Sequence, residues 1–451
     1  MDTSEVLSIL MVIALMALLF SGYPVALVLI AVTMMFTVIG ILVGEMNVQM
    51  VRAFPLRIYS LLAESLIFSA IPPLIFMGVA IAKSGLATDL FTSVGKLLRR
   101  VPGGLALTVL LLGVLIAPSA GVVGASVGIL ALAAMPTMLE ANYDKAFASG
   151  AVAAAGTLGI ILPPAVMLFF LADLVGSQLL GMFVGILLPA GVLVSAYALY
   201  FVLRGRRLAS PSGTPGISQG GETIFVIVRK VLPAVLLIGS VLASMIGGLA
   251  TPSQAGAIGA AGAFLLMLGR RSFSLALLKD VLVETTHIIA MIFLIIIAAN
   301  AFSLVFRVFG GDEALARGLD ALGLGSWGKL LFILGVVFVL GFFIDWLEIV
   351  LITLPIFVPV IAQLDFTAHV GDAQLVSVWI GVAVALVLQT SFLTPPFGFA
   401  LFFLRGSSPP NIKMSDIYRG VAPIVVIQLA VLCVVLAYPW LATVLARMVM
   451  G

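Results

Sequence analysis

The feature that most limits the fold of this chain is a series of long apolar stretches that follow one another along its whole length. A helix that spans the hydrocarbon core of a bilayer takes about 20 apolar residues. Stretches of about that length or longer lie at residues 6–42, 58–82, 104–139, 146–172, 181–203, 224–268, 286–306, 330–362, 376–404 and 421–446. Several are long enough for two passes, so the sequence predicts an all-α polytopic membrane protein with roughly a dozen spans or half-spans.

The composition also favours a lipid environment. Hydrophobic residues make up 63% of the chain and charged residues only 9%, whereas soluble domains average about 25% charged residues. A net charge of +3 gives no reason to expect a nucleic-acid partner, so the expected surroundings are the lipid bilayer. Clusters of Lys and Arg favour the cytoplasmic side. They lie at Lys96–Arg100, Arg204–Arg207, Arg229–Lys230 and Arg270–Arg271.

One segment near the middle of the chain is clearly polar. Residues 203–223, LRGRRLASPSGTPGISQGGET, are rich in Gly, Ser, Pro and Arg, which is typical of a surface connection. The sequence therefore predicts a first half at residues 1–202, a linker at 203–223 and a second half at 224–451.

The two predicted halves share four features in the same order. These are a polar break in the first apolar run (21–26 and 250–255), a phenylalanine before a span (Phe54 and Phe273), a proline in a later span (Pro136 and Pro355) and a double proline (Pro163–Pro164 and Pro395–Pro396). The prolines are offset by 228, 219 and 232 residues and the phenylalanines by 219. This order indicates a duplication, and an odd number of spans in each half would make the repeats inverted.

The double prolines lie inside apolar stretches, in TLGIILPPAVMLFF (157–170) and TSFLTPPFGFALFF (390–403). Proline removes a backbone donor and prevents the preceding helix from continuing. Irregular backbone at membrane depth is tolerated only where protein, water or a ligand satisfies it. Matched breaks in two halves are typical of secondary transporters, so we expect broken helices at 156–170 and 389–403.

Small and polar residues stand just before both double prolines. The first break offers Gly156, Thr157 and Gly159, and the second offers Gln389, Thr390, Ser391 and Thr394. Freed carbonyls suit a hard cation such as sodium, and the N-termini of half-helices suit an anion. The alternative is a kinked structural helix, which is less favoured because both copies place such residues on the same side of the prolines.

A candidate hairpin precedes each break. In the first half, Pro118, Ser119 and Gly121 indicate the tip of a re-entrant hairpin, and Gly124 with Gly128 forms a G-x-x-x-G pattern that usually means close helix packing. The corresponding stretch of the second half is GFFIDWLEIVLITLP (341–355).

Two acidic residues of that second stretch, Asp345 and Glu348, are three positions apart and would share one face of a helix. A charge at mid-membrane costs roughly 2.5–3.5 kcal/mol or more, so such residues are usually functional. The alternative places Asp345 at an interfacial turn.

The chain also offers evidence against an enzyme. Residues 323–329 (GLGSWGK) have the spacing of a phosphate loop, but Leu330 follows where Ser or Thr would bind magnesium. The sequence contains neither an H-E-x-x-H motif nor a Ser–His or paired-acid constellation. We expect no catalysis, no ATP hydrolysis and no cofactor.

Residues 89–100 (DLFTSVGKLLRR) indicate an interfacial amphipathic helix or connecting arm.

Several of these motifs together resemble the large membrane subunit of tripartite ATP-independent periplasmic (TRAP) transporters, which belong to the ion transporter superfamily. The resemblance runs in order through nearly the whole chain. The motifs are SGYPVA (21–26), SAIPPLIFMG (69–78), GTLGIILPP (156–164), GLATPSQAGAIG (248–259), GFFIDWLEIVLITLPIFVP (341–359) and TSFLTPPFGFALFF (390–403).

The resemblance implies an elevator-type transporter of the bacterial inner membrane, in which each half carries scaffold helices, an arm, a hairpin and a broken helix. It also implies sodium-driven uptake of an organic acid anion, together with a small four-helix membrane subunit and a periplasmic substrate-binding protein. By position it assigns ion and substrate binding to Ser119, Gly121, Gly156, Thr157, Gly159, Asp345, Gln389, Thr390, Ser391 and Thr394.

One departure from the family concerns the first hairpin tip. Many members carry a Ser-Gly-Ser-like tip, whereas this chain has PSAGVVGAS at 118–126. That variant is similar to the branch with 2-oxo acid, lactate, mannitol or chloroaromatic names, so a C4-dicarboxylate or sialic acid is less favoured and the choice of carboxylate stays open. The alternative function is a passive channel, for which the repeated filter loops or pore rings are missing.

Overall fold

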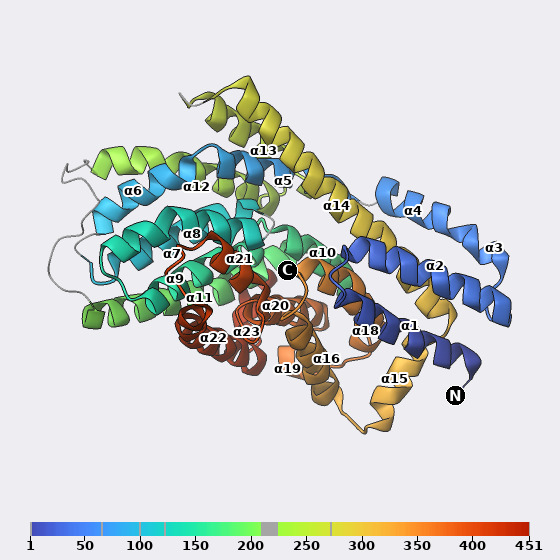
Figure 1. Ribbon diagram of the computed structural model, residues 1–451. Coiled ribbons are helices and arrows are strands. Elements are labelled where there is room, and N and C mark those ends of the chain that lie inside the picture. The colour runs from blue at the N-terminus through green and yellow to red at the C-terminus, as the bar shows by residue number, and fades with distance from the viewer. Residues whose placement is uncertain are drawn as a thin grey trace.

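Every regular element that the computed structural model describes is a helix (Figure 1). The structure describes residues 2–64, 66–98, 101–120, 123–208, 224–270 and 273–450. The helices of the first half are α1 (Thr3–Leu19), α2 (Val25–Val43), α3 (Val48–Val51), α4 (Ala53–Glu64), α5 (Leu66–Lys83), α6 (Leu86–Leu98), α7 (Gly104–Ala120), α8 (Val123–Glu140), α9 (Lys145–Thr157), the 3₁₀ turn η1 (Leu158–Ile160), α10 (Val166–Leu174) and α11 (Leu179–Leu208).

The second half has a similar series of elements. They are α12 (Ile224–Ile246), α13 (Pro252–Leu268), α14 (Leu275–Val308), α15 (Gly311–Ala321), α16 (Ser326–Leu340), α17 (Trp346–Glu348), the π-helical turn η2 (Ile349–Thr353), α18 (Leu354–Ile361), α19 (Thr367–Val370), α20 (Ala373–Ser391), α21 (Phe399–Ser407), α22 (Met414–Ala437) and α23 (Trp440–Met450).

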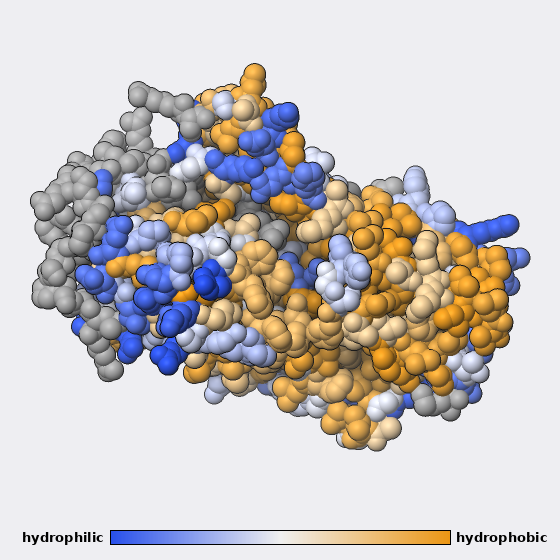
Figure 2. Space-filling model, viewed as in Figure 1, coloured by the Kyte–Doolittle hydropathy of each residue, from blue (hydrophilic) through white to orange (hydrophobic). Residues whose placement is uncertain are grey.

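Six helices of the described residues are long and apolar enough to cross a membrane, and several shorter apolar helices accompany them. The six are α2, α8, α11, α14, α20 and α22, with α11 counted from Leu179 to Arg206. Large apolar side chains such as Leu42, Leu132 and Leu265 are exposed, and the surface over α1 and α2 is broadly apolar (Figure 2). The prediction of an all-α polytopic membrane protein is therefore confirmed.

The helices pack in two groups. The first contains α1, α2, α5, α12, α13, α14 and α15, in which α5 packs on α13 and α2 packs on α14. The second contains α7 to α11 and α16 to α23, in which α9 packs on α7, α8 and α22, and α20 packs on α11, α16 and α22. Figure 1 shows α2, α4 and α14 on the right and upper side, and α7, α8, α9 and α11 on the left.

The helices α7 and α8 form a hairpin, called hairpin 1 below, whose two outer ends meet at the C-terminal end of α11. Just before α7, a β-carbon on Gly103 would lie 2.3 Å from the carbonyl oxygen of Phe201. Just after α8, the ring of Phe147 lies 5.8 Å from that of Phe201 and is stacked on Tyr143. Hairpin 1 therefore enters and leaves at one end of the molecule.

The helices α16 to α18 form hairpin 2, whose outer ends meet at the other end of α11. The ring of Trp327, at the start of α16, lies 5.0 Å from Phe366, beyond α18, and 5.8 Å from Trp379 at the start of α20. The neighbouring Val378 contacts the positions of Gly181 and Gly185 near the start of α11. The two hairpins therefore enter from opposite ends.

The broken helices also run in opposite directions. The helix α9 starts near Phe201, at the end of α11, whereas α20 starts near Gly181, at its beginning. The first is interrupted at residues 158–165 and resumes as α10; the second is interrupted at 392–398 and resumes as α21. Both double prolines lie in these interruptions, and each contains a cis peptide bond.

One local expectation differs from the structure, and another is met as far as the chain is described. The polar linker does not begin at residue 203, because α11 continues to Leu208; Leu and Arg are good helix formers, so the helix outlasts the apolar run. Residues 209–223 lie outside the described part of the chain. The expected helix at 89–100 is present as α6, whose described residues end at Leu98.

Very close packing joins α9 to α22. A β-carbon on Gly420 would lie 2.0 Å from the carbonyl oxygen of Ala146, and one on Gly150 would lie 2.2 Å from that of Gly420. Only glycine permits this approach, because both obstacles are backbone atoms that cannot turn aside.

We expect Gly420→Ala to destabilise the protein by about 1–3 kcal/mol, because the added methyl group overpacks a backbone contact. Thermal unfolding of the detergent-purified chain measures this effect. The matched control is Gly191→Ala in α11, where a β-carbon meets nothing within 4 Å and a change within about 0.5 kcal/mol is expected. Equal melting of the two variants would contradict the proposed contact.

Candidate functional site

The first break places its three expected residues in a buried layer. Gly156, Thr157 and Gly159 are all buried. A β-carbon on Gly156 would lie 2.5 Å from Cγ2 of Val127, so this glycine lets α9 approach α8 closely. The Thr157 hydroxyl donates within its own helix, 3.1 Å from the carbonyl oxygen of Ala153. It keeps acceptor capacity for another partner.

The prolines of the first break leave two carbonyl groups without their usual helical partner. In an α-helix each carbonyl accepts from the N–H four residues later. For Gly159 and Ile160 those residues are Pro163 and Pro164, which have no N–H. Among the described residues, no backbone N–H outside the helices donates to either carbonyl oxygen, so both can receive a ligand.

The second break differs at the same positions. The carbonyls four residues before its prolines belong to Ser391 and Phe392. Ser391 accepts from the Thr394 N–H at 3.1 Å, and Phe392 accepts from the Ala400 N–H at 3.2 Å. The loop thus satisfies the carbonyls that the prolines would otherwise leave open, and the two breaks are not equivalent.

The hydroxyl groups of the second break donate along their own helix. Thr390 donates to the Leu386 carbonyl at 2.7 Å, Ser391 to Leu388 at 2.7 Å, and Thr394 to Thr390 at 2.9 Å. Each hydroxyl oxygen retains lone pairs for a cation.

The Gln389 side chain has no such partner. It is fully buried, and among the described residues neither its amide oxygen nor its amide nitrogen meets a hydrogen-bond partner. A buried polar group that loses water in this way costs roughly 1–3 kcal/mol. Gln389 is therefore the expected residue with the strongest need for a ligand.

The tip of hairpin 2 lies against the second break. A β-carbon on Gly341 would lie only 1.8 Å from the Ser391 hydroxyl oxygen. Asp345 caps α17 by accepting from the Trp346 N–H at 2.8 Å. The Trp346 ring lies 6.0 Å from Phe170 of α10, so this tip contacts both broken helices.

The helix that follows Asp345 is irregular. Its residues Ile349–Thr353 form a π-helical turn, a feature often found at functional sites. Within the described residues, Oε2 of Glu348 and Nε1 of Trp346 are buried without a hydrogen-bond partner. The tip therefore has polar capacity that the protein itself leaves unused.

The structure describes only some of the residues expected at the tip of hairpin 1. Gly121 lies outside the described residues, and so does the side chain of Ser119, although α7 extends to Ala120. The expected close packing of the G-x-x-x-G pattern is confirmed on α21. β-Carbons on Gly124 and Gly128 would lie 2.7 Å from the Phe403 ring and 3.2 Å from the Ser407 hydroxyl oxygen.

These segments meet in one region. The turn η1 contacts α7, α8, α10 and α20, and α21 contacts α8 and α9. The structure therefore brings Gly156, Thr157 and Gly159 near the helix that carries Gln389, Thr390 and Ser391.

Sequence reasoning overlooked two further buried polar residues, Tyr197 and Gln428. Of these, Gln428 is detectable as an amide inside the apolar run of α22.

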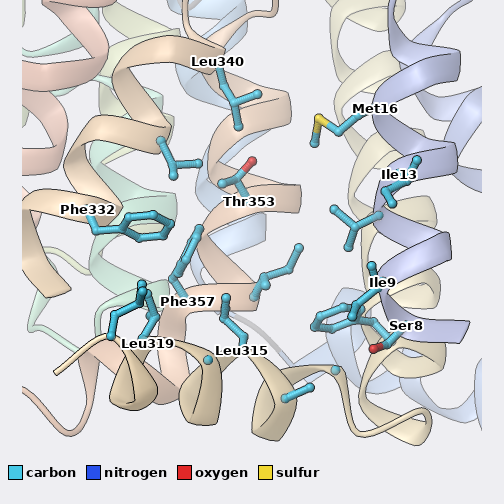
Figure 3. Close-up of a pocket in the computed structure, with 18 residues that line it drawn as sticks. Ser8, Ile9, Ile13, Met16, Leu315, Leu319, Phe332, Leu340, Thr353 and Phe357 are labelled. Carbon is cyan, nitrogen blue, oxygen red and sulfur yellow. The ribbon is translucent and has the colours of Figure 1, made fainter. Parts of the chain in front are cut away.

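A cavity of about 650 Å³ lies elsewhere, between α1, α15 and hairpin 2. In Figure 3, Phe332 and Phe357 line one side, Ile9 and Ile13 of α1 line the other, and Leu315 and Leu319 close one end. None of the expected site residues that the structure describes lines it. The lining is mostly apolar, and its polar side chains are Ser8 and Thr353.

Comparisons with known proteins place this arrangement in a family. Residues 12–441 match the family described as "Tripartite ATP-independent periplasmic transporter, DctM component". The chain is 27% identical over 393 residues to the C4-dicarboxylate TRAP transporter large permease protein DctM of Pseudomonas aeruginosa, which covers 86% of this chain and 88% of that protein.

Two further similarities bear on the architecture. The chain is 26% identical over 385 residues to the isethionate TRAP transporter permease protein DctMQ of Oleidesulfovibrio alaskensis, covering 83% of this chain and 57% of that longer protein. The YdaH transporter of Alcanivorax borkumensis has the same fold, with a TM-score of 0.57, 16% identity and coverage of 88% and 89% of the two chains. Because the family match spans nearly the whole sequence, this chain belongs to the DctM family, the large permease subunits of TRAP transporters, which are transport proteins and not enzymes.

Proposed function

We propose that the chain carries out sodium-coupled uptake of an organic acid anion across the bacterial inner membrane. The observation that carries this proposal is the meeting of two broken helices at a buried layer of oxygen-bearing groups, of which Gln389 lacks any partner in the described structure. Buried polar groups of this kind are satisfied by a ligand or by water.

The proposed cation ligands are neutral oxygens and one carboxylate. The open carbonyls of Gly159 and Ile160, with Gly156 and Thr157 beside them, provide hard oxygen atoms in the first half. In the second half we propose Gln389, Thr390, Ser391 and Thr394, together with Asp345, whose charge would offset that of a bound ion. By position, Ser119 and Gly121 of hairpin 1 stay in the proposal.

The proposed site for the solute lies at the N-termini of the half-helices. Both α10 and α21 begin at a break, at Val166 and Phe399. Unpaired N–H groups and the helix dipole favour an anion there. Relatives are named for C4-dicarboxylate and isethionate, both of which carry an acidic group. These points support an organic acid anion as the solute class.

The architecture supports an alternating mechanism of the elevator type. Hairpins that enter from opposite ends, and broken helices that run in opposite directions, are the arrangement expected of inverted repeats. Lys96 of α6 and Arg204 of α11 lie at the end where hairpin 1 enters, which we assign to the cytoplasm. The apolar cavity between hairpin 2 and α1 would let hairpin 2 move against α1 and α15.

The proposed partners follow from the family. TRAP transporters are tripartite, and the DctMQ relative is a longer permease protein that matches this chain over only 57% of its length. We therefore propose a small four-helix membrane subunit and a periplasmic substrate-binding protein as partners of this chain.

Uptake into proteoliposomes tests the coupling. We expect solute to accumulate when the chain, its small subunit and the cognate binding protein are present with an inward sodium gradient. Replacing sodium by potassium at equal ionic strength should abolish the accumulation. Uptake that is indifferent to the sodium gradient would refute sodium coupling.

We expect Asp345→Asn to reduce sodium-driven uptake at least 100-fold, because it removes the proposed counter-charge, and to leave the assembled complex stable. A loss of about 2.7 kcal/mol corresponds to that factor. The matched control, Asp365→Asn, changes an exposed carboxyl that accepts from the Thr367 N–H, and uptake should be unchanged. Retained uptake by Asp345→Asn would remove this residue from the site.

We expect Gln389→Leu to abolish sodium-dependent uptake while keeping or raising the melting temperature in sodium-free buffer. Leucine fills a similar volume and removes two unpaired polar atoms, so no hydrogen bond of the described structure is lost. Gln363→Leu, at an exposed position, is the control and should leave uptake unchanged. A lower melting temperature together with normal uptake would assign Gln389 a purely structural role.

A further inference from the structure

A second buried glutamine, Gln428, is not part of the site proposed above. Gln428 of α22 is only 1% exposed, and among the described residues both of its amide atoms lack a hydrogen-bond partner. The fully buried hydroxyl of Tyr197, on α11, lies beside this amide but outside hydrogen-bond geometry. Such a pair costs free energy unless something else satisfies it.

Gln428 lies on the face of α22 that packs against both broken helices. Eight residues earlier on that face, Gly420 contacts Gly150 of α9. Seven residues later, the Val435 carbonyl accepts from Nε1 of Trp379 in α20, at 2.8 Å. Spacings of seven and eight residues return to the same side of a helix, so Gln428 sits between these two contacts.

The depth of Gln428 in the bundle matches that of the first break. α9 and α22 run in the same direction, since Lys145 at the start of α9 donates to the Asn411 carbonyl just before α22. Thr157 is seven residues beyond Gly150, and Gln428 is eight beyond Gly420. At about 1.5 Å per residue, the two differ in depth by about 1.5 Å.

Gln389 lies close to the same depth. α20 and α22 are antiparallel, because Trp379 near the start of α20 meets Val435 near the end of α22. Gln389 lies ten residues after Trp379 in α20, and Gln428 lies seven residues before Val435 in α22. The difference is about one helical turn, or roughly 5 Å.

Gln389 lies on the face of α20 that packs against α11, the helix that carries Tyr197. Val378 and Val382 of α20 contact the positions of Gly181 and Gly185 on α11, and Gln389 follows them by eleven and seven residues, which is the same helix face. Ser391 points away from that face, towards Gly341 of hairpin 2. The three polar residues therefore gather on the α11 side of α20, away from Asp345.

The surroundings favour a cation over an anion at this place. Helix α9 ends at Thr157 and α20 ends at Ser391, so two helix C-termini reach this layer. The helix dipole places a partial negative charge, equivalent to about half an elementary charge, at each C-terminus. Carboxamide and phenolic oxygens are also ligands that hard cations accept.

We propose that Gln428 and Tyr197 complete, with Gln389, a monovalent-cation site on the α11 side of α20. The amide oxygens of Gln389 and Gln428 bind the ion. In the occupied site the Gln428 amide N–H donates to the Tyr197 oxygen, which makes Tyr197 a positioning residue that fixes the amide orientation. This inference rests on the proposed sodium coupling.

A sodium titration of the detergent-purified full chain tests the site, with choline keeping the ionic strength constant and the melting temperature as the readout. We expect Gln428→Leu to raise the sodium concentration for half-maximal stabilisation about tenfold, and Tyr197→Phe to raise it about threefold. In sodium-free buffer Gln428→Leu should melt at or above the wild-type temperature, because it removes atoms that lack partners. The control, Gln374→Leu, is exposed and should titrate like wild type.

The outcomes separate this inference from the proposed function. If wild type responds to sodium and Gln428→Leu has the same half-maximal concentration, Gln428 does not bind the ion and the inference is overturned while sodium coupling stands. If Gln428→Leu fails to fold, Tyr197→Phe, which removes only one oxygen atom, is the variant to titrate. An unchanged half-maximal sodium concentration in Tyr197→Phe would also overturn the site. A wild-type chain with no sodium response, together with gradient-independent uptake, refutes the proposed function itself.

Discussion

The structure depends on one constraint: in lipid, every backbone N–H and C=O must find a partner inside the protein. Continuous helices meet this demand alone, but α9 and α20 stop at mid-bundle. Other segments must therefore enclose both breaks. Hairpin 1 covers the first through α7 and α8, and hairpin 2 covers the second through the contact between Gly341 and Ser391. Glycines at Gly150, Gly156 and Gly420 allow the close approach that this enclosure needs.

The same motif meets this constraint in two ways. The first break leaves the carbonyls of Gly159 and Ile160 without helical donors. The second is largely closed by protein, since the Ala400 N–H returns to Phe392 and the Tyr418 hydroxyl donates to the Pro396 carbonyl. The similar halves therefore supply different ligands: backbone oxygens in the first half and side chains such as Gln389 in the second.

Much of the fold follows from sequence because its causes are local. Apolar length predicts the spans, and prolines beside Gly159 and Gly398 predict the breaks. Yet a third double proline, Pro72–Pro73, lies inside the continuous helix α5, so the dipeptide alone does not determine a break. The pairing of Gln428 with Tyr197 was also beyond sequence reasoning, because it depends on how α11 and α22 pack against each other. That packing has no short-range sequence signal.

We propose that the prolines of the first break keep carbonyl groups open for sodium. The most direct test of this proposal is sodium binding by the purified chain, measured by calorimetry, in wild type and in the double variant Pro163→Ala/Pro164→Ala. Alanine restores two N–H groups that can bond to Gly159 and Ile160 and extend α9. We expect wild type to bind sodium in preference to potassium and the folded double variant to lose at least tenfold in sodium affinity. Unchanged sodium affinity in the double variant would contradict the proposal.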